Sequence, residues 1–533
     1  MKIFPCLTFL ALLTASVTAQ ENIIPKPAQL QMGAHEAFTF LDDSDITIVS
    51  DDERELQCAR FVAKMMGEQL GRKIALNEYP SGTQFEVPSA GAIMFFACDE
   101  LKDMGEESYK ITASGDSLAV YYASPEGLLR ACASLIQIIE PNKTTLGVKS
   151  FCLTDAPRYQ WRAVMLDEAR HFYGEKAVKD LLGQMFLLKM NVFHWHLTDN
   201  DGWRVEIKKY PRLTEISSKR SDTEAIKWKS GKSIGHPHEG FYTQEQIKRI
   251  IAYAAERGIT IIPEFDVPGH STAAAVAYPW LSLKKLDKMP TTFGSNLALD
   301  PTKESTYEFV SNVFGELAEL FPSPIMHFGG DEVRFAKQWK GEPAIEAFMK
   351  EKGYTTLSEV QLYFTERVQQ IIQSKGKRAM GWNEIMGGDI HGDGGGKDIK
   401  GKVMTDTIIH YWDGPISLVK DAILDGHDVV NSANPYTYMD FDYKRTPMQK
   451  SYSFNPTPAG LTPEQRERLL GMGVQVWTEW MPTVEYMQQM LFPRLIALSE
   501  VAWTAKEKKN YEDFLKRLKA FAPRLHFKMK NED

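Results

Sequence analysis

The chain has 533 residues, 43% of them hydrophobic and 25% charged, which fits a large globular protein of more than one domain. Its formal net charge of −8 provides no basic surface for nucleic acid or for anionic lipid. Beyond the N-terminal segment, no apolar stretch is long enough to span a membrane. The composition therefore excludes nucleic-acid binding and membrane spanning as main activities.

Residues 1–19 predict a signal peptide. A positive start at Met1-Lys2 precedes an apolar run over 3–17, and the small residues at 17–19 form a cleavage site. We expect cleavage after Ala19 and export, to the periplasm or to the exterior. Export permits disulfides, but helical and strand contexts favour buried thiols at least as strongly for the remaining cysteines, and their spacing fits no metal site. These cysteines are Cys58, Cys98, Cys132 and Cys152.

Residues 20–157 predict a smaller, non-catalytic α+β domain. An amphipathic helix over 51–70 is followed by buried strands over 92–97 and 117–122. A second helix follows over 126–139, because Ser124 is an N-cap residue and Pro125 suits the first helical position. This domain contains no residue pattern typical of catalysis.

Residues 158–533 predict a catalytic (β/α)₈ TIM barrel with C-terminal helices. Buried β runs alternate there with amphipathic helices such as 175–190, 244–257, 303–320 and 357–374, and this alternation is typical of a parallel sheet. Eight repeats of the unit predict a closed barrel, with its active site at the carboxyl ends of the strands. The predicted strands cover 162–166, 192–197, 260–265, 325–328, 378–382, 407–411, 428–431 and 473–477.

The strand ends carry the residues that suggest chemistry. Asp331 and Glu332 follow two glycines directly after the fourth strand, and the break in the strand lets both carboxyl groups face one cleft. Two such groups push each other's pKa values apart, which produces a proton donor beside an anion. Trp382, Trp412 and Trp477 lie at matching positions of three other strands, and aromatic walls among carboxylates suit a sugar.

Several longer motifs occur in order along the barrel half. They are Trp161-Arg162 with Leu166-Asp167 and Ala169-Arg170-His171-Phe172, then His-Trp-His-Leu-Thr-Asp at 194–199, Pro-Glu-Phe-Asp-Val-Pro-Gly-His at 263–270, and His-Phe-Gly-Gly-Asp-Glu at 327–332. Together they resemble glycoside hydrolase family 20, the β-N-acetylhexosaminidases. The resemblance covers nearly the whole mature chain, since the first domain is similar to the family's non-catalytic domain. One departure is local: after Asp199 the family continues with Asp and Gln, whereas this chain has Asn200-Asp201.

The resemblance implies an exo-acting retaining hydrolase that removes terminal N-acetylglucosamine or N-acetylgalactosamine from glycans without a cofactor. In this family the 2-acetamido oxygen of the substrate is the nucleophile and an oxazolinium ion is the intermediate. Glu332 is then the general acid and base, while Asp331 and Tyr438 orient the acetamido group. The resemblance also implies further residues. Those expected to bind substrate are Arg162, Trp382, Trp412, Asp440, Trp477 and Glu479, and those expected behind them are Asp199, Glu264 and His270.

Other readings of the sequence remain open. The enzyme could release a terminal disaccharide, as a lacto-N-biosidase does, or the barrel could bind sugars without cutting them. A metal-dependent hydrolase would use His194 and His196, which face the same side of a strand, but this leaves the carboxylates and tryptophans unexplained. A glycine-rich insertion at 391–402 and a loop at 442–458 are specific to this chain, and either could shape a site beyond the first sugar. The sequence does not separate the two epimeric sugars or define the oligomeric state.

Overall fold

The computed structural model of the chain describes residues 19–84, 91–140, 146–224, 232–387, 403–525, 527 and 529–530. The predicted signal peptide, apart from Ala19, and the glycine-rich insertion at 391–402 lie outside these residues. Within the described ranges, no helix combines the length and the apolar character that crossing a membrane requires.

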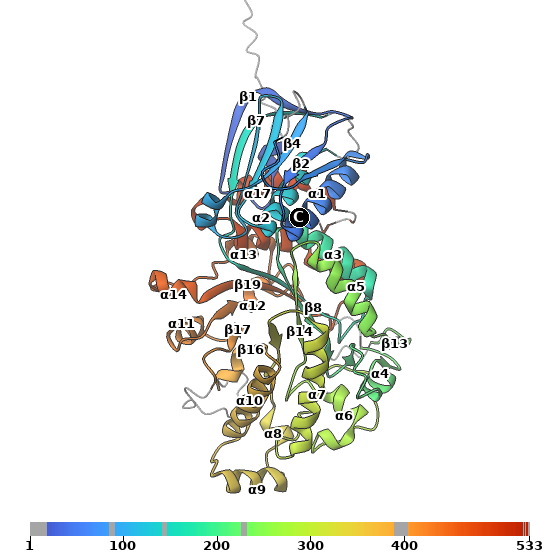
Figure 1. The fold of residues 1–533 in the computed structure, drawn as a ribbon. Coiled ribbons are helices and arrows are strands. Elements are labelled where there is room, and N and C mark those ends of the chain that lie inside the picture. The colour runs from blue at the N-terminus through green and yellow to red at the C-terminus, as the bar shows by residue number, and fades with distance from the viewer. Residues whose placement is uncertain are drawn as a thin grey trace, which may run out of the picture.

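The N-terminal domain is a seven-stranded mixed sheet, coloured blue to cyan in Figure 1. The strand order is β1-β7-β5-β6-β4-β2-β3. Helices α1 (Glu53–Leu70) and α2 (Pro125–Ile138) lie between this sheet and the barrel (Figure 1). The strands are β1 (Gln29–Phe40), β2 (Ile46–Val49), β3 (Leu76–Tyr79), β4 (Ala92–Ala97), β5 (Tyr109–Ser114), β6 (Ser117–Tyr122) and β7 (Leu146–Asp155).

Local capping explains where these two helices begin and end. The Asp52 carboxylate accepts hydrogen bonds from the first backbone N–H groups of α1, and Gly71 ends the helix in the left-handed conformation, at φ +73°. Ser124 caps α2 by accepting from the N–H of Gly127, with Pro125 at the first helical position, as the sequence predicted. The four cysteines among the described residues are free thiols, and Cys58 and Cys132 are buried.

The second part of the chain is a closed barrel of eight parallel strands, in the order β14-β15-β16-β17-β18-β19-β8-β9. The predicted fold class is therefore confirmed, and every predicted strand corresponds to one barrel strand. The strands are β8 (Trp161–Asp167), β9 (Val192–His196), β14 (Thr260–Glu264), β15 (Ile325–His327), β16 (Arg378–Trp382), β17 (Ile408–Tyr411), β18 (Val429–Asn431) and β19 (Leu469–Val476). Short strand pairs outside the barrel are β10 (Thr198–Asp199) with β11 (Gly202–Trp203) and β12 (Lys219–Arg220) with β13 (His238–Glu239).

Helices surround the barrel and complete the connections between strands (Figure 1). A capping box at Thr243 and Gln246 begins α5, and another at Thr356 and Glu359 begins α10. The helices of the described residues after the first domain are α3 (Glu175–Leu187), α4 (Arg212–Ser217), α5 (Gln244–Ala255), α6 (Thr272–Ala277), α7 (Glu304–Leu320), α8 (Phe335–Gln338), α9 (Pro343–Lys352), α10 (Leu357–Ser374), α11 (Ser417–Leu424), α12 (Asn434–Thr437), α13 (Met448–Ser453), α14 (Pro463–Glu467), α15 (Val484–Leu491), α16 (Arg494–Trp503) and α17 (Tyr511–Phe521), the last of which lies beside α2 (Figure 1).

A buried polar network joins the sheet of the first domain to the barrel. The Lys189 ammonium, which follows α3, contacts the Asp155 carboxylate at 2.9 Å and the Tyr109 hydroxyl at 2.8 Å. The Trp503 indole N–H of α16 donates to the same carboxylate at 3.0 Å. The Tyr109 hydroxyl also donates to Asp155, at 2.7 Å. Because Lys189, Tyr109 and Trp503 are themselves buried around this carboxylate, the interface fixes the first domain against the amino end of the barrel, opposite to the strand ends that carry the motifs.

Candidate active site

A cavity of about 230 Å³ opens at the carboxyl ends of the barrel strands. It brings together nine of the residues that the sequence pointed to, drawn from six different strand ends and loops. It also contains Arg170, which the sequence analysis quoted within a motif but gave no role. The predicted residues that line it are His270, Asp331, Glu332, Trp382, Trp412, Tyr438, Asp440, Trp477 and Glu479.

The backbone after β15 explains how two adjacent acids share this cavity. Gly329 and Gly330 have φ values of +67° and +93°, and Glu332 has φ +48°, so the alternation of a strand is broken. A Cβ atom on Gly329 would lie 1.7 Å from an oxygen of Asp266, so a side chain cannot be accommodated there. The N–H of Gly330 instead donates to that oxygen at 3.2 Å. The glycines therefore let the chain turn both carboxyl groups into the same space.

Asp331 is the more buried of the two acids, with 7% of its surface exposed. Burial, and then the nearby carboxylates of Glu384 and Glu332, raise its pKa to about 7, although His270 acts in the opposite direction. Its Oδ1 atom is buried and has no hydrogen-bond partner among the residues that the structure describes. An acceptor oxygen in this state needs a donor, and a ligand N–H in the cavity would supply one.

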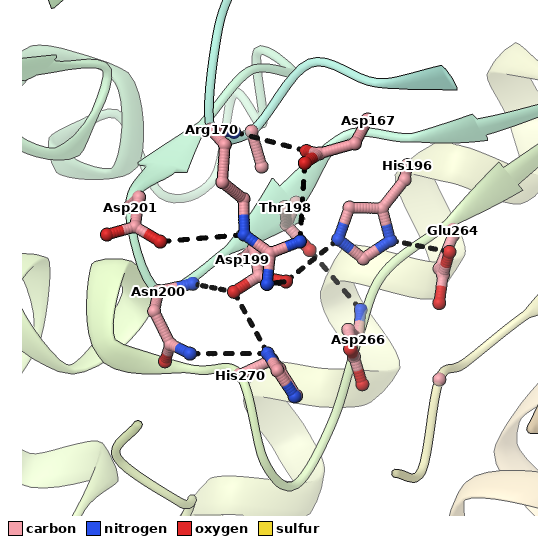
Figure 2. Close-up of polar contacts among 12 residues, drawn as sticks. Asp167, Arg170, His196, Thr198, Asp199, Asn200, Asp201, Glu264, Asp266 and His270 are labelled. Carbon is pink, nitrogen blue, oxygen red and sulfur yellow. Dashed lines mark hydrogen bonds and ion pairs between the residues drawn. The ribbon is translucent and has the colours of Figure 1, made fainter. Parts of the chain in front are cut away.

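Behind the acids, His270 forms a relay with Asp199 (Figure 2). Its Nδ1 atom lies 3.0 Å from Asp199, while Nε2 points to the acids, 3.6 Å from Glu332 and 3.7 Å from Asp331. Burial alone would lower the pKa of His270, but Asp199 and Asp331 outweigh it and raise the pKa well above its usual value. His270 is therefore a cation that faces both acids, as expected for a residue that tunes Glu332.

Glu264 lies behind the Trp382 wall of the cavity. Its carboxylate accepts from the Trp382 indole N–H at 2.9 Å and contacts the imidazole of His196 at 2.6 Å. His196 in turn lies 2.9 Å from Asp199, so one path of contacts links Glu264 to Glu332 through His196, Asp199 and His270 (Figure 2). Glu264 thus contacts both the Trp382 ring and the buried imidazoles of His194 and His196.

The aromatic residues form the walls of the cavity. The rings of Trp412 and Tyr438 stack with centroids 6.0 Å apart and planes 18° apart, and Trp382 and Trp477 lie 5.9 Å apart. Burial raises the pKa of Tyr438 well above its usual value, so its hydroxyl stays protonated and can donate a hydrogen bond. The walls thus combine apolar faces with one donor close to the acids.

Arg162 was predicted to grip the sugar, and this prediction is wrong. Arg162 lies near the amino end of β8, is fully buried, and forms two contacts of 2.7 and 2.8 Å with Glu107 of the first domain. It also donates to the carbonyls of Lys189 and Tyr159, both at 2.8 Å. Since the active site lies at the opposite end of the strand, Arg162 is an interface residue.

Arg170 occupies the position that had been assigned to Arg162. Its guanidinium is buried among four carboxylates, at 2.9 Å from Asp199, 3.3 Å from Asp167, 3.5 Å from Asp201 and 3.7 Å from Glu479. Figure 2 shows it beside Asp199 at the end of β8. The sequence signal for this residue was its place just after the carboxyl end of the first strand.

Glu479 and Asp440 complete the polar side of the cavity. Burial is the main reason that the pKa of each rises to about 7, and each also has a carboxylate neighbour. Thr478 fixes the chain just before Glu479 to the end of β8, because its hydroxyl and N–H both donate to Asp167. Carboxyl groups with raised pKa values can donate as well as accept hydrogen bonds near neutral pH, which suits sugar hydroxyls.

His194, one of the two histidines named for a metal-dependent mechanism, does not line the cavity. His194, His327 and His410 are buried together inside the barrel, with one nitrogen of each within 4.8 Å of the others. Their contacts include Glu264 and the underside of Trp382, and none of the three lines the cavity. His196, the other residue of that hypothesis, is engaged by Glu264 and Asp199. The cavity itself is built from carboxylates and aromatic rings.

The fold and the cavity together define a barrel hydrolase built for a sugar, with an acid pair at the end of the fourth strand. Comparison with known sequences identifies its family. The profile for "Glycosyl hydrolase family 20, catalytic domain" matches residues 159–506, and that for "Glycosyl hydrolase family 20, domain 2" matches residues 20–156. The chain belongs to glycosyl hydrolase family 20, and it is a glycoside hydrolase.

Individual relatives extend over most of the chain. The "Beta-hexosaminidase" of Vibrio furnissii is 36% identical over 91% of this chain and 77% of its own length. The "Beta-hexosaminidase" of Porphyromonas gingivalis is 31% identical over 95% of this chain, which spans only 63% of that protein. Among solved structures, an exo-β-N-acetylglucosaminidase of Vibrio harveyi in complex with N-acetylglucosamine has a TM-score of 0.81 and 31% identity, covering 96% of this chain and 79% of that one.

Proposed function

We propose that this chain is an exo-acting, retaining β-N-acetylhexosaminidase that uses substrate-assisted catalysis. The observation that carries the proposal is the pairing of Asp331 and Glu332 in one aromatic cavity, where the buried Oδ1 of Asp331 has no donor among the described residues. The cavity of about 230 Å³ is smaller than the roughly 300–1,000 Å³ of pockets for drug-sized ligands. This size favours a single terminal sugar. The family and the names of the relatives support the same activity.

In the first step, Asp331 accepts a hydrogen bond from the acetamido N–H and Tyr438 donates one to the acetamido oxygen. That oxygen forms a bond to the anomeric carbon while the glycosidic C–O bond breaks, and the Glu332 proton passes to the leaving oxygen. Holding the nucleophile within the substrate replaces a bimolecular encounter by an intramolecular attack. The negative charge of Asp331 stabilises the cationic oxazolinium ring that results.

In the second step, Glu332 acts as the base. It removes a proton from water as the water oxygen attacks the anomeric carbon, and the acetamido oxygen is released with the configuration retained. The His270 cation at 3.6 Å stabilises the ionised form of Glu332 that this step requires. Arg170 and Glu479 hold the hydroxyls at the far side of the sugar, with Asp440 beside them.

The natural substrates are, in this proposal, glycans with a terminal β-linked N-acetylhexosamine. Support for an exported location comes from residues 1–19, whose composition is that of a signal peptide. Expression of the full chain in a bacterial host, followed by mass spectrometry of the secreted or periplasmic product, tests this part. An N-terminus at Gln20 is expected, whereas an intact Met1 would contradict export by this signal.

The experiment that tests the activity compares two aryl glycosides. Rapid release of nitrophenol from nitrophenyl N-acetyl-β-D-glucosaminide, with essentially none from the β-glucoside, is expected because only the first carries the nucleophile. Comparable rates on both would refute substrate assistance. The galacto epimer then defines specificity at O4, and a nitrophenyl disaccharide tests for release of two sugars. Activity on the disaccharide alone would overturn the exo-hexosaminidase assignment.

A further inference from the structure

A second cavity of about 220 Å³ adjoins the first one on the other side of Glu332. The two share Arg170, His270, Glu332 and Glu479 as lining residues. The carboxyl group that protonates the glycosidic oxygen therefore faces both spaces. Because the first cavity takes the terminal sugar, the second one is the space next to the bond that breaks.

One wall of this second cavity is aromatic. Phe293 and Trp480 meet edge to face, with centroids 5.0 Å apart and planes 85° apart. Aromatic rings of this kind pack against the C–H face of a sugar ring. The cavity can accordingly hold a second sugar, whose recognition would depend on the polar residues around it.

Two arginines line the second cavity, and they differ in how their charge is neutralised. Arg170 is almost fully buried and has four carboxylates within 3.7 Å, so its charge is already matched. Asp201 and Glu479, which also line the cavity, are two of these four. Arg334 has 32% of its side chain exposed, and among the described residues its acidic partner is Glu332, at 3.3 Å. Arg334 is thus the cation that is open to a new anion.

The contact between Arg334 and Glu332 works against the first step of the reaction. A guanidinium beside a carboxyl group favours the ionised form, whereas a general acid must begin protonated. An anion that took over Arg334 would remove this opposition at the moment of binding. The position of Arg334 also limits where that anion can be. An acid lies within about 3 Å of the oxygen that it protonates, so Arg334 lies within about one sugar ring of the glycosidic oxygen.

We propose that the second cavity binds the leaving sugar, and that Arg334 recognises a carboxylate or sulfate group carried by that sugar. This inference rests on the proposed hexosaminidase activity and names the class of substrate that the site prefers. Arg334 is a specificity residue here, because it contacts the substrate's substituent and leaves the bond-breaking step to Glu332.

A matched set of disaccharides tests the proposal. The three substrates are N-acetylglucosamine β-1,4-linked to N-acetylglucosamine, the same disaccharide with a lactyl ether at O3 of the leaving sugar, and the methyl ester of that lactyl group. The ester has the bulk of the lactyl group without its charge. The protein with Arg334 should hydrolyse the lactyl acid with a kcat/KM about tenfold above that of the ester, as expected for one charge-assisted contact.

The variant Arg334→Gln should reduce this ratio to near one. Lys337→Gln removes a neighbouring exposed charge that does not line the cavity, and it should keep the ratio unchanged. An equal ratio in the parent protein and in Arg334→Gln would overturn the proposal. Glucuronate and glucose as leaving sugars form a second pair, which tells whether the favoured anion is a ring carboxylate or a lactyl carboxylate.

Two further controls separate the possible failures. The nitrophenyl N-acetyl-β-D-glucosaminide has no leaving sugar, so loss of its hydrolysis would refute the proposed function itself. Activity on it without any charge preference among the disaccharides would refute the role of Arg334 alone. A substrate with a sulfate at O6 of the terminal sugar is the last comparison. A charge preference for this substrate alone would place the anion in the first cavity, which holds the terminal sugar, and would also overturn the proposal.

Discussion

The replacement Arg162→Met separates the interface role of this residue from the substrate-binding role that the sequence suggested. In the structure Arg162 forms two contacts with Glu107, and Arg130 contacts the same carboxylate at 2.7 Å. We expect the variant to be less stable and, in its folded fraction, to keep the KM of the parent protein. Its active-site counterpart is Arg170→Lys, which retains the charge but loses the planar fork, and which should raise KM instead.

The magnitude follows from the electrostatics of Glu107. Burial by itself raises the pKa of this group, but Arg162 and Arg130 outweigh it and lower the pKa to about 2. Compared with the ordinary value of 4.5, this shift corresponds to about 3 kcal/mol shared between two arginines. Arg162→Met removes part of it, together with two hydrogen bonds to buried carbonyls at about 1 kcal/mol each. The free energy of unfolding should fall by about 3–4 kcal/mol.

The pH dependence of the loss has a definite sign. The pKa of Glu107 is lower in the folded protein than in the unfolded chain, so the stabilisation is complete above pH 4.5 and is lost as the pH falls toward 2. The difference between variant and parent should therefore be constant at neutral pH and shrink below about pH 4.

Thermal melting at pH 7, followed by circular dichroism, measures the effect, with steady-state kinetics on the aryl glycoside beside it. Arg60→Met is the control, since Arg60 forms an exposed two-pronged pair with Glu78 and should hardly change the melting temperature. A normal melting temperature with kcat/KM reduced a hundredfold would refute the interface assignment and return Arg162 to the active site.

Three other predictions follow from the site. Glu332→Gln should lower kcat by about 10²–10⁴-fold on a natural disaccharide and less on a nitrophenyl glycoside, whose good leaving group needs little protonation; equal losses on both would contradict the acid role. Asp331→Asn should abolish turnover but stabilise the fold by up to about 4 kcal/mol at pH 8. This gain in stability should disappear as the pH falls from 7 to 4, because the buried Asp331 carboxyl destabilises the parent protein only while it is ionised. A gain in stability that persists at pH 4 would show another cause. Trp412→Ala should raise KM about tenfold through loss of a wall of the cavity, and an unchanged KM would place the acetamido group elsewhere.

The identity of the elements was available from the chain alone. Buried β runs and period-3.6 hydrophobic patterns depend on neighbours in sequence, so they located all eight barrel strands. The fold class followed from the order of those elements, because parallel strands with intervening helices have few ways to close. The acid pair could also be predicted from the sequence. Two glycines directly before two carboxyl groups indicate a bend in the backbone, and that bend depends only on neighbouring residues.

Which arginine faces the substrate was decided by the tertiary structure. Arg162 lies near the start of β8, and Arg170 lies just past its end. The strand between them spans about 20 Å. The partner of Arg162 is Glu107, 55 residues away in another domain, and no local pattern predicts that pairing. The contact between Glu264 and Trp382, 118 residues apart, has the same reason.

The sequence by itself thus determined the elements, their order and the chemical groups at the strand ends, because each depends on short-range constraints along the chain. The tertiary structure decided which of those groups meet, since buried charges are satisfied by partners that are brought together only when the barrel closes and the first domain packs against it. The exposure of Arg334 to the second cavity was likewise decided by the tertiary structure, because it depends on the loops that surround Glu332.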